Sequence, residues 1–533
     1  MVGKKNKNVT KNEFNQVVEG TSLTREAWKR LRKNKMAVLG MVIVALYALV
    51  AAFAGVLPLY PYYEQVIDHK QLQPSLTKTA GELMMDKQLQ DIYYKAWKEG
   101  RLVVTEEENK EIKTWIQEGQ TTKVWKFLYK EGEKQREEGT FEFSDSDKKT
   151  IARYEEKINS DIMITLNSIY ADVNGKLTNL DKADYLELEE VYASISSGMT
   201  VEQINSAIQR ELIASRVNEI RTTDTEISQE DAQVQAEIDV ENYSEKQYSK
   251  LAKENILGKI EKQANKESLA KIKAELKANP DLEFPIKEKM TLDSGLVVNI
   301  KASRTNDRHY YLGTDSLGRD LLSRIIYGGR VSIAIGLVGT ITSVLIGIFV
   351  GSIAGYKGGK VDYYLMRFVD VMYGLPYMLL VIIFMAIFER GMFNLFIALA
   401  IISWLTIARM VRGQIMSLKN QEYVEAARSM GASTSRIIMR HMIPNSLSVI
   451  IVYSTIRIPN FIMQESFLSF LGLGVQAPFA SWGSLIGDAV ASMTVYPWLL
   501  VYPSLAMVIF LFAMNFFGDG LRDAFDPQSK NQL

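Results

Sequence analysis

Uncharged stretches and strongly charged stretches alternate along this chain. A helix needs about 20 apolar residues to cross the hydrocarbon core of a bilayer, and two uncharged runs reach that length, residues 36–57 and 331–356. Shorter uncharged runs follow at about 371–388, 391–408 and 443–456, and a last one ends at Phe517 and Gly518. The pattern predicts an all-α polytopic membrane protein with six transmembrane helices.

Basic residues crowd the chain immediately before the first apolar run, and an excess of Lys and Arg marks the cytoplasmic side of a span. They are Arg25, Lys29, Arg30, Arg32, Lys33 and Lys35. We therefore expect residues 1–35 to be a cytoplasmic segment and 36–57 to be the first transmembrane helix. A cleavable signal peptide is the alternative, because "AFA" at 52–54 imitates a cleavage site, but the apolar run exceeds the roughly 7 to 15 residues of a signal core.

Alternation across six spans assigns a side of the membrane to every other segment. The loop at 357–367 and the segment 409–444 fall inside, and both carry several Lys and Arg residues. The tail 519–533 is then also cytoplasmic. Residues 58–310 fall outside the cell, since a domain of this length can translocate largely regardless of its own charge.

Residues 58–310 are charged and helix-forming, without apolar runs of membrane length. Capping boxes, in which two side chains bond each other's backbone amides, are predicted at Thr105 with Glu108 and at Thr200 with Gln203. A helix ending before Pro280 is predicted from the apolar stripe Leu251, Ile256, Ile260, Leu269, Ile272 and Leu276. Residues 290–300 indicate a short hairpin. We expect a mainly helical extracellular domain with a small β-hairpin, acting as a docking surface.

The composition excludes several kinds of chemistry. The chain has no cysteine, so it forms no disulfide framework, thiolate metal site or cysteine nucleophile. Its three histidines are too few for a convincing metal cluster, and "DVNG" at 172–175 lacks most ligand positions of an EF-hand. Acidic and basic residues balance at 62 each, so no excess charge points to nucleic acid. We expect neither a catalytic residue nor a bound metal.

The segment 422–445, "EYVEAARSMGASTSRIIMRHMIPN", looks like a DNA-reading helix-turn-helix. Such a motif needs a soluble domain to hold its recognition helix in the major groove, whereas here it lies between two apolar runs. A solvated amphipathic loop and a compact helix-glycine-helix unit are the other interpretations. The last is favoured because Ala426 and Ala427 keep the first helix slim, Gly431 permits a turn, and Pro444 suits the start of the next helix.

Six residues of this segment resemble the EAA loop of bacterial ABC-importer permeases: Glu425, Ala426, Ala427, Gly431, Ile443 and Pro444. His441 departs from the aliphatic residue usual in the broad family, but "RHMIPN" at 440–445 is similar to the "RHxLPN" of its peptide-importer branch. Residues 312–333, residues 465–489 and the N-terminal "REAWKRLRKNKMAVLG" also resemble that branch, the oligopeptide and dipeptide permease C subunits. The match covers roughly residues 22–80 and 305–528, and the segment between is an insertion.

The resemblance implies the type I ABC importer permease fold, with transmembrane helices 2–6 in a permease core over residues 311–518. In that family the EAA loop, here within 409–444, docks into a cleft of a cytosolic ATPase. By resemblance, the coupling residues are Glu425, Ala426, Ala427, Gly431, His441 and Pro444. Alternatively, these residues serve only to fold the loop. This chain has no G-x-x-x-x-G-K-[ST] phosphate loop, so ATP and Mg belong to partner subunits and we expect no cofactor on this chain.

Charged residues also occur within the expected spans. A charge deep in the bilayer costs about 3 kcal/mol or more and normally faces a cavity or a partner. Arg457 and Glu465 flank Pro459 and, eight residues apart on one helix, lie near the same face. One hypothesis is that these three residues line the translocation path or a gate. An ion pair to a companion permease, or an interfacial position, is the alternative.

A polar turn precedes the second span and contains Gly313, Asp315, Gly318, Arg319 and Asp320. By resemblance it belongs to the external mouth, where a binding protein delivers peptide. Charged capping of the helix that follows is the alternative.

These observations predict a permease subunit of an ATP-driven oligopeptide importer in the cytoplasmic membrane, not itself an enzyme. The expected partners are a homologous permease in a heterodimer, one or two ABC ATPase subunits, membrane lipid and an extracellular peptide-binding protein, which is a lipoprotein where the cell has no outer membrane. One alternative keeps the fold and imports another solute, such as nickel chelates. The other is a membrane-anchored receptor that acts through the extracellular helical domain.

Overall fold

The structure, a computed structural model, describes residues 23–196, 199–223, 227–279, 282–388 and 391–525. Within it the chain divides into two compact units. The first comprises the residues up to 78, residues 90–141 and the residues from 309 onward, and the second comprises 79–89 and 142–308. The expected domain 58–310 is therefore divided. Residues 90–141 cluster with the membrane helices, and the Thr122 hydroxyl there donates to the Val495 carbonyl at 2.6 Å.

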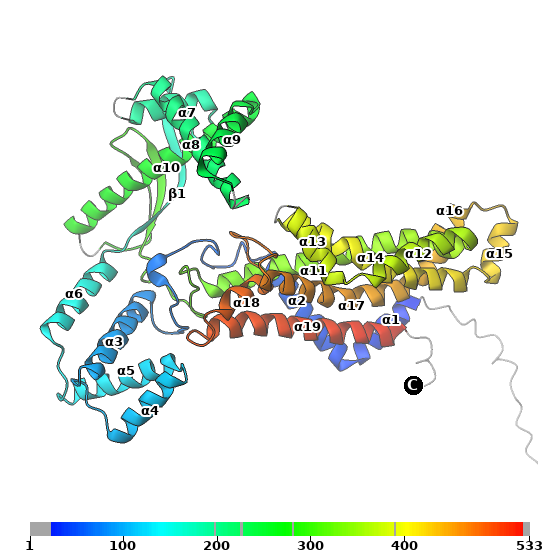
Figure 1. The fold of residues 1–533 in the computed structure, drawn as a ribbon, viewed down its shortest axis with the longest axis horizontal. Helices are drawn as coiled ribbons and strands as arrows, with labels where there is room; N and C mark the ends of the chain where they lie inside the picture. The colour runs from blue at the N-terminus through cyan, green and yellow to red at the C-terminus, as the bar shows by residue number, and fades with distance from the viewer. Residues whose placement is uncertain (1–22, 197–198, 224–226, 280–281, 389–390, 526–533) are drawn as a thin grey trace, which may run out of the picture. The chain divides into compact units, whose positions relative to one another are not determined.

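Five helices of the described chain are long and apolar enough to cross a membrane, and the helical prediction is confirmed. They include α2 (Lys35–Ala52), α11 (Leu321–Lys357), α14 (Met392–Leu418), α17 (Ile443–Phe470) and α19 (Trp498–Phe525), all in the first unit (Figure 1). The apolar run expected at about 371–388 instead falls across two helices, α12 (Gly359–Gly374) and α13 (Tyr377–Ile387), which are bent by 85°. They add a sixth span only if the bent pair is one span.

Small residues let α11 and α14 approach each other closely. Gly347, Gly351 and Gly355 recur at four-residue spacing on α11. A Cβ atom on Gly351 would lie 2.5 Å from the carbonyl oxygen of Ala408, and one on Gly355 would lie 2.8 Å from that of Arg412. Membrane helices associate through such small-residue faces because lipid supplies no hydrophobic force between them. The two helices therefore pack as one pair.

The basic segment before the first span forms a helix of its own, α1 (Leu23–Lys33). Asn34 separates it from α2, since the Asn34 side chain accepts the amides of Met36 and Ala37 at 3.1 and 3.2 Å. On the apolar side of α1, Leu31 is buried together with Ala524 of α19. This contact holds the start of α2 against the C-terminal end of α19, the last candidate span.

The remaining regular elements of the first unit lie outside the candidate spans. They are η1 (Ile67–His69), α3 (Ala80–Lys98) from residue 90 onward, α4 (Glu106–Gln117), α5 (Thr121–Glu137) and α18 (Trp482–Val490), besides α15, α16 and η2 described below. The predicted capping box starts α4: the Glu108 amide donates to the Thr105 hydroxyl at 3.3 Å, and the Thr105 amide donates to the Glu108 carboxylate at 2.8 Å. These bonds from Thr105 hold the pKa of Glu108 below its usual value.

The second unit is an α+β domain, with more sheet than the sequence predicted. Its strands β1 (Met163–Val173), β2 (Lys176–Asn179), β3 (Ile286–Thr291) and β4 (Val297–Ser303) form an antiparallel sheet in the order β2-β1-β4-β3. The hairpin β3-β4 confirms the one predicted within residues 290–300. Besides residues 80–89 of α3, the helices of this unit are α6 (Asp145–Asn159), α7 (Tyr185–Ile195), α8 (Val201–Thr223), α9 (Gln229–Glu241) and α10 (Glu245–Ala278). The strands β1 and β2 were not predicted.

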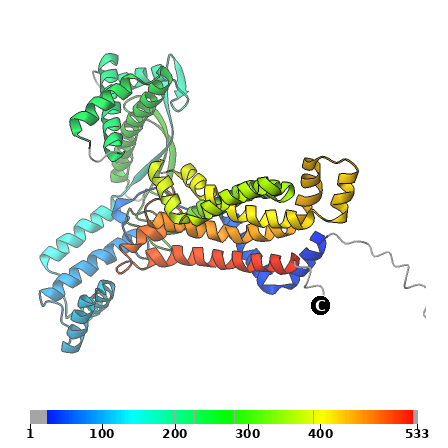
Figure 2. The same ribbon diagram turned by 45° about the vertical axis from the view of Figure 1, so that its right-hand side comes forward.

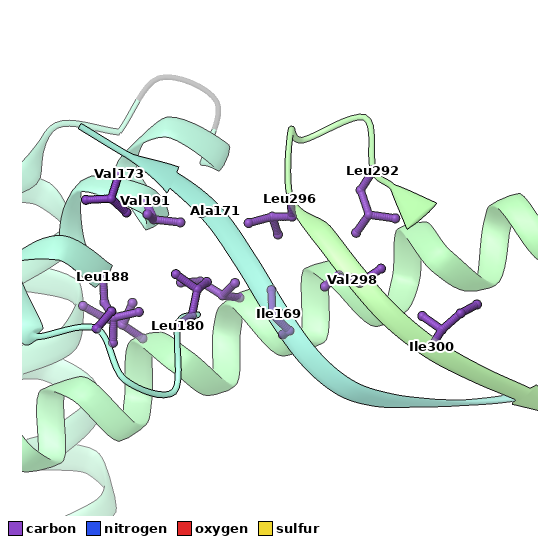
Figure 3. Close-up of a cluster of buried hydrophobic side chains, with 14 of the residues drawn as sticks. Ile169, Ala171, Val173, Leu180, Leu188, Val191, Leu292, Leu296, Val298 and Ile300 are labelled. Atoms are coloured by element: carbon purple, nitrogen blue, oxygen red, sulfur yellow. The ribbon is translucent and has the colours of Figure 1, made fainter. Parts of the chain in front are cut away.

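The predicted apolar stripe of α10 covers this sheet. Ile256, Ile260 and Ile272 are fully buried in the core, together with side chains of β1 and β4. Figure 3 shows Ile169 of β1 and Val298 of β4 in this cluster. The stripe is confirmed, and α10 ends at Ala278, before Pro280. The capping box at Thr200 and Gln203 is also present, with the two backbone amides bonded at 3.0 and 3.3 Å.

Candidate functional site

The segment after α14 folds as the helix-glycine-helix unit that the sequence predicts. α15 (Glu422–Ser429) is followed by a turn at Gly431 and by the short helix α16 (Thr434–Ile437). A π-helical turn, η2 (Ile438–Met442), then leads into α17, whose first turn contains Pro444. α15 and α16 lie at the end of α17 opposite to α18 in both views (Figure 1; Figure 2). We call residues 419–444, which lie within the predicted loop 409–444, the coupling segment.

Gly431 ends α15 in a Schellman cap, which closes a helix through a residue with a positive φ angle. The Ala432 amide donates to the Ala427 carbonyl at 3.1 Å, and the Gly431 amide donates to the Arg428 carbonyl at 3.0 Å. Gly431 has φ +79°, and a Cβ atom placed there would meet no atom within 4 Å. Glycine is therefore needed for its backbone conformation and not for a contact within this chain.

The inner face of the coupling segment packs on the membrane helices through apolar side chains. Val424 and Ala427 of α15 are buried in one cluster with Ile407 and Ile415 of α14 and with Ile450 of α17. Close packing transmits displacement because a dense core has few voids to absorb it. The predicted site residue Ala427 thus faces the core of its own chain.

The outer face of the coupling segment is open. Glu425, Ala426, Gly431 and Pro444 are exposed, and the side chain of Met430, at the C-cap of α15, is 81% exposed. Four of the six predicted coupling residues therefore lie on a face available to another protein. His441 is only partly exposed, and its carbonyl accepts the Asn445 side-chain amide at 2.5 Å.

Arg457 lines a pocket of about 310 Å³ at the break between α12 and α13. The pocket is lined by Met372, Tyr373, Leu375, Tyr377, Ile402, Ser403, Leu405, Thr406, Arg457 and Gln464. The Arg457 guanidinium donates to the Ser403 carbonyl at 3.4 Å. The Tyr377 hydroxyl donates to the Gln464 side-chain oxygen at 2.6 Å. These residues come from α12, α13, α14 and α17, so the pocket is formed by the tertiary packing.

Glu465 lies elsewhere, fully buried between α17 and the start of α18. One carboxyl oxygen accepts the hydroxyls of Ser469 and Ser481, both at 2.6 Å, and the other has no hydrogen-bond partner in the described chain. Ser481 is the N-cap of α18 and also accepts the Ser484 amide at 3.0 Å. The structure therefore does not bring Glu465 together with Arg457. Eight residues on a helix turn through about 80°, which is enough to point the two side chains at different neighbours.

Pro459 is buried inside α17 and lies between these two groups in the sequence. Of Arg457, Pro459 and Glu465, only Arg457 is a lining residue of the pocket. That these residues line a translocation path or a gate stays a prediction.

The predicted external-mouth residues form a buried network that also caps α11. The Asp315 carboxylate accepts the guanidinium of Arg319 at 2.7 Å and that of Arg324 at 2.8 Å, and all three side chains are nearly inaccessible to solvent. Asp320 is the N-cap of α11 and accepts the Ser323 amide at 2.9 Å. The capping alternative thus describes Asp320, and the other charges stabilise the turn from within.

The two glycines of this turn permit close contact with the chain that follows the first span. Gly318 has φ +73°, and a Cβ atom there would lie 1.8 Å from the carbonyl oxygen of Val66. Gly313 has φ +81°, and a Cβ atom there would lie 2.5 Å from the carbonyl oxygen of Leu72. The turn therefore anchors residues 66–72, a role that was not expected from the sequence.

The pocket residues Tyr373, Tyr377 and Gln464 were not predicted, and neither was Arg324 in the turn network. Tyr377 and Gln464 are polar positions inside apolar runs, a pattern that marks functional or packing sites in membrane helices. That signal was present in the sequence. The pairing of Arg324 with Asp315 could not be predicted from a periodic pattern in the sequence, since it depends on the fold of the turn.

Comparison with known proteins identifies two matching families. Residues 347–531 match the family described as binding-protein-dependent transport system inner membrane component. Residues 22–74 match the N-terminal TM domain of oligopeptide transport permease C. An inward-facing structure of the MetNI methionine ABC transporter aligns with 38% of this chain and 97% of its own chain, at 19% identity and a TM-score of 0.34.

Curated relatives share much higher identity. The oligopeptide transport system permease protein OppC of Haemophilus influenzae is 47% identical over 231 residues, which are 43% of this chain and 74% of that protein. OppC of Bacillus subtilis is 44% identical over 229 residues, 43% of this chain and 75% of the relative. The dipeptide transport system permease protein DppC of Bacillus subtilis is 44% identical over 220 residues, 41% and 69% of the two chains. This chain therefore belongs to the family of binding-protein-dependent transport inner-membrane components, among the oligopeptide permease C proteins.

Proposed function

We propose that this chain is the permease C subunit of an ATP-driven importer that carries oligopeptides across the cytoplasmic membrane. The observation that carries the proposal is the coupling segment, which has an apolar inner face packed on α14 and α17 and an exposed outer face. Such a segment can receive a push from a separate protein and pass it to two membrane helices. Identity of 44 to 47% with oligopeptide permeases supports the peptide cargo.

The physical sequence of events follows from this packing. An ATPase that moves the outer face of α15 displaces the buried cluster around Val424 and Ala427, and that cluster includes Ile415 of α14 and Ile450 of α17. α14 also packs on the glycines of α11, so it moves with that helix. The pocket at Arg457 is walled by α14 and α17 and changes shape when they shift. ATP and Mg are bound by the partner subunits, and this chain is the permease and not an enzyme.

We also propose a membrane topology for this chain. α12 and α13 together make the third of six spans, the coupling segment and both termini are cytoplasmic, and the second unit and residues 90–141 are extracellular. The basic α1 before the first span supports this orientation, since Lys and Arg gather on the cytoplasmic side.

The proposed partners complete the importer. A homologous permease forms the other half of the translocation path in a heterodimer, one or two ABC ATPases bind the coupling segments, and an extracellular peptide-binding protein, a lipoprotein where the cell has no outer membrane, delivers the cargo. Membership in a transport family disfavours the receptor alternative, and the peptide permeases among the relatives disfavour nickel chelates.

Single-cysteine labelling tests the orientation and the docking together, because the chain has no cysteine of its own. Met430→Cys places a thiol on the outer face of the coupling segment, and Val103→Cys places one on an exposed position of residues 90–141. We expect an impermeant thiol reagent to label Val103→Cys in intact cells and Met430→Cys only in inside-out vesicles, where the bound ATPase slows the reaction. Labelling of Met430→Cys in intact cells contradicts the proposal.

Peptide uptake tests the cargo. The complete importer in proteoliposomes is expected to accumulate a labelled oligopeptide only with ATP and binding protein present. Uptake of nickel chelates but not peptides contradicts the oligopeptide assignment.

A further inference from the structure

Arg457 differs from the two arginines of α14 in having no carboxylate partner within the described chain. Arg409 of α14 pairs with Asp370 at 2.7 Å, and Arg412 pairs with Asp362, with one contact at 2.6 Å. The hydrogen bond that Arg457 makes there is the long one to the Ser403 carbonyl. A guanidinium within a membrane helix normally faces a cavity or a counter-charge. Arg457 faces the cavity, and the described residues of this chain supply no counter-charge.

The other polar groups of the pocket also favour a negative ligand. None of its described lining residues is acidic. The Gln464 side-chain oxygen is occupied by the Tyr377 hydroxyl. Since an amide group has one oxygen and one NH₂, the NH₂ of Gln464 remains as a donor. The pocket therefore offers the guanidinium and an amide as donors, with tyrosine rings beside them.

The broken helix adds a third favourable element. α13 begins at the pocket wall, between the lining residues Leu375 and Tyr377, and its N-cap residue Pro376 provides no side-chain cap. The first amides of a helix carry a partial positive charge and bind anions when left uncapped. Discontinuous membrane helices present such ends to the anionic groups of transported substrates. The uncapped start of α13 therefore adjoins the same cavity that Arg457 lines.

We propose that this pocket binds the C-terminal carboxylate of the transported peptide, with Arg457 and Gln464 as donors and with Tyr373 and Tyr377 flanking the last residue. This inference rests on the proposed peptide import. A carboxylate side chain of the companion permease is the competing partner for Arg457. The peptide is favoured because the pocket has a volume of about 310 Å³ and aromatic walls, the size and lining of small-molecule sites, whereas a single ion pair needs no such cavity.

The test compares two cargoes that differ only at the C-terminus. The complete importer is reconstituted in proteoliposomes, and ATP-dependent uptake is measured for labelled tetra-alanine and for its C-terminal amide, each saturating the binding protein. We expect the wild type to move the acid about tenfold faster or more, the factor that corresponds to one charge-assisted hydrogen bond. Arg457→Met is expected to bring the ratio of the two rates near one, and Arg457→Lys to give an intermediate ratio.

The control is Arg367→Met, which removes an exposed arginine of α12 outside the pocket and is expected to keep the wild-type ratio. An unchanged ratio in Arg457→Met overturns the inference while leaving peptide import intact. Loss of the companion permease from purified Arg457→Met complexes also overturns it, since Arg457 is then an interface residue. Absence of ATP-dependent uptake of either peptide by the wild type refutes the proposed function itself, and the inference with it.

Discussion

The two ends of α17 are held by different kinds of interaction. At one end, Val424 and Ala427 of the coupling segment are buried in an apolar cluster that includes Ile450 of α17. At the other end, Glu465 is fully buried and holds α18 through the hydroxyls of Ser469 and Ser481. Apolar contacts are non-directional and tolerate small shifts, whereas hydrogen bonds lose strength when their geometry changes. The first end is suited to transmitting motion and the second to fixing a position.

The difference also separates stability from function. The Glu465 side chain has no exposed surface, so its substitution should act on folding and assembly. At the coupling end, a buried inner face and an exposed outer face lie on the same short helix, so neighbouring residues there should act on different properties. Substitution of Glu465 should therefore lower the free energy of unfolding most, and substitutions on the outer face of α15 should change it least.

The largest effect is expected at Glu465. Glu465→Ala leaves the hydroxyls of Ser469 and Ser481 without an acceptor and opens a cavity, which should lower the free energy of unfolding by about 2 to 3 kcal/mol. Glu465→Gln keeps an acceptor oxygen and should cost less than about 1 kcal/mol. The measurement is detergent-induced unfolding of the purified complex.

The same variants distinguish a structural role from a gate. If Glu465 positions α18, uptake per assembled complex is unchanged in Glu465→Gln. A loss of uptake in Glu465→Gln with normal stability and assembly would assign Glu465 to the path and would remove the contrast between the two ends.

Regions whose interactions join residues close in the sequence could be predicted, and regions whose interactions join distant elements could not. The coupling unit was predictable because its signals are local: an alanine pair, a glycine with positive φ and a proline lie within 20 residues of sequence. The capping boxes and the stripe of α10 were predictable for the same reason. The partners of Glu465 and Arg457 were not, because Ser481 and Ser403 lie on other elements and only tertiary packing selects them.

The sheet of the second unit shows the same limit. β1 pairs with β4, which lies more than a hundred residues later in the chain, so its short alternating pattern had no local partner to support it. The hairpin β3-β4 has its turn within one short stretch and was found. The run at about 371–388 was expected to form one span, whereas the structure bends it by 85° where Pro376 stands, because proline interrupts main-chain hydrogen bonding.

An intermediate effect is expected at Gly431. Gly431→Val forces a β-branched residue into the positive φ region and should cost about 1 to 2 kcal/mol, confined to the cap of α15 and sparing the membrane helices. ATP-dependent peptide uptake should fall at least tenfold while membrane insertion is retained. Gly431→Asn, which tolerates this conformation better, should keep most of the uptake. Equal uptake in wild type and Gly431→Val would refute the requirement for an intact cap.

The smallest effect on stability, and the sharpest test of the contrast, is expected at Ala426. This residue is exposed beside the buried Ala427, so Ala426→Arg should change the free energy of unfolding by less than about 0.5 kcal/mol. A long charged side chain at a docking face should nevertheless keep the ATPase from approaching, and peptide uptake should fall at least tenfold together with ATPase recovery in purified complexes. Ala426→Ser adds little volume and is the matched control, expected to behave like the wild type. Normal ATPase recovery and uptake in Ala426→Arg would mean that the outer face of α15 is not the docking surface, because a side chain of that size cannot be accommodated within a close protein-protein contact without loss.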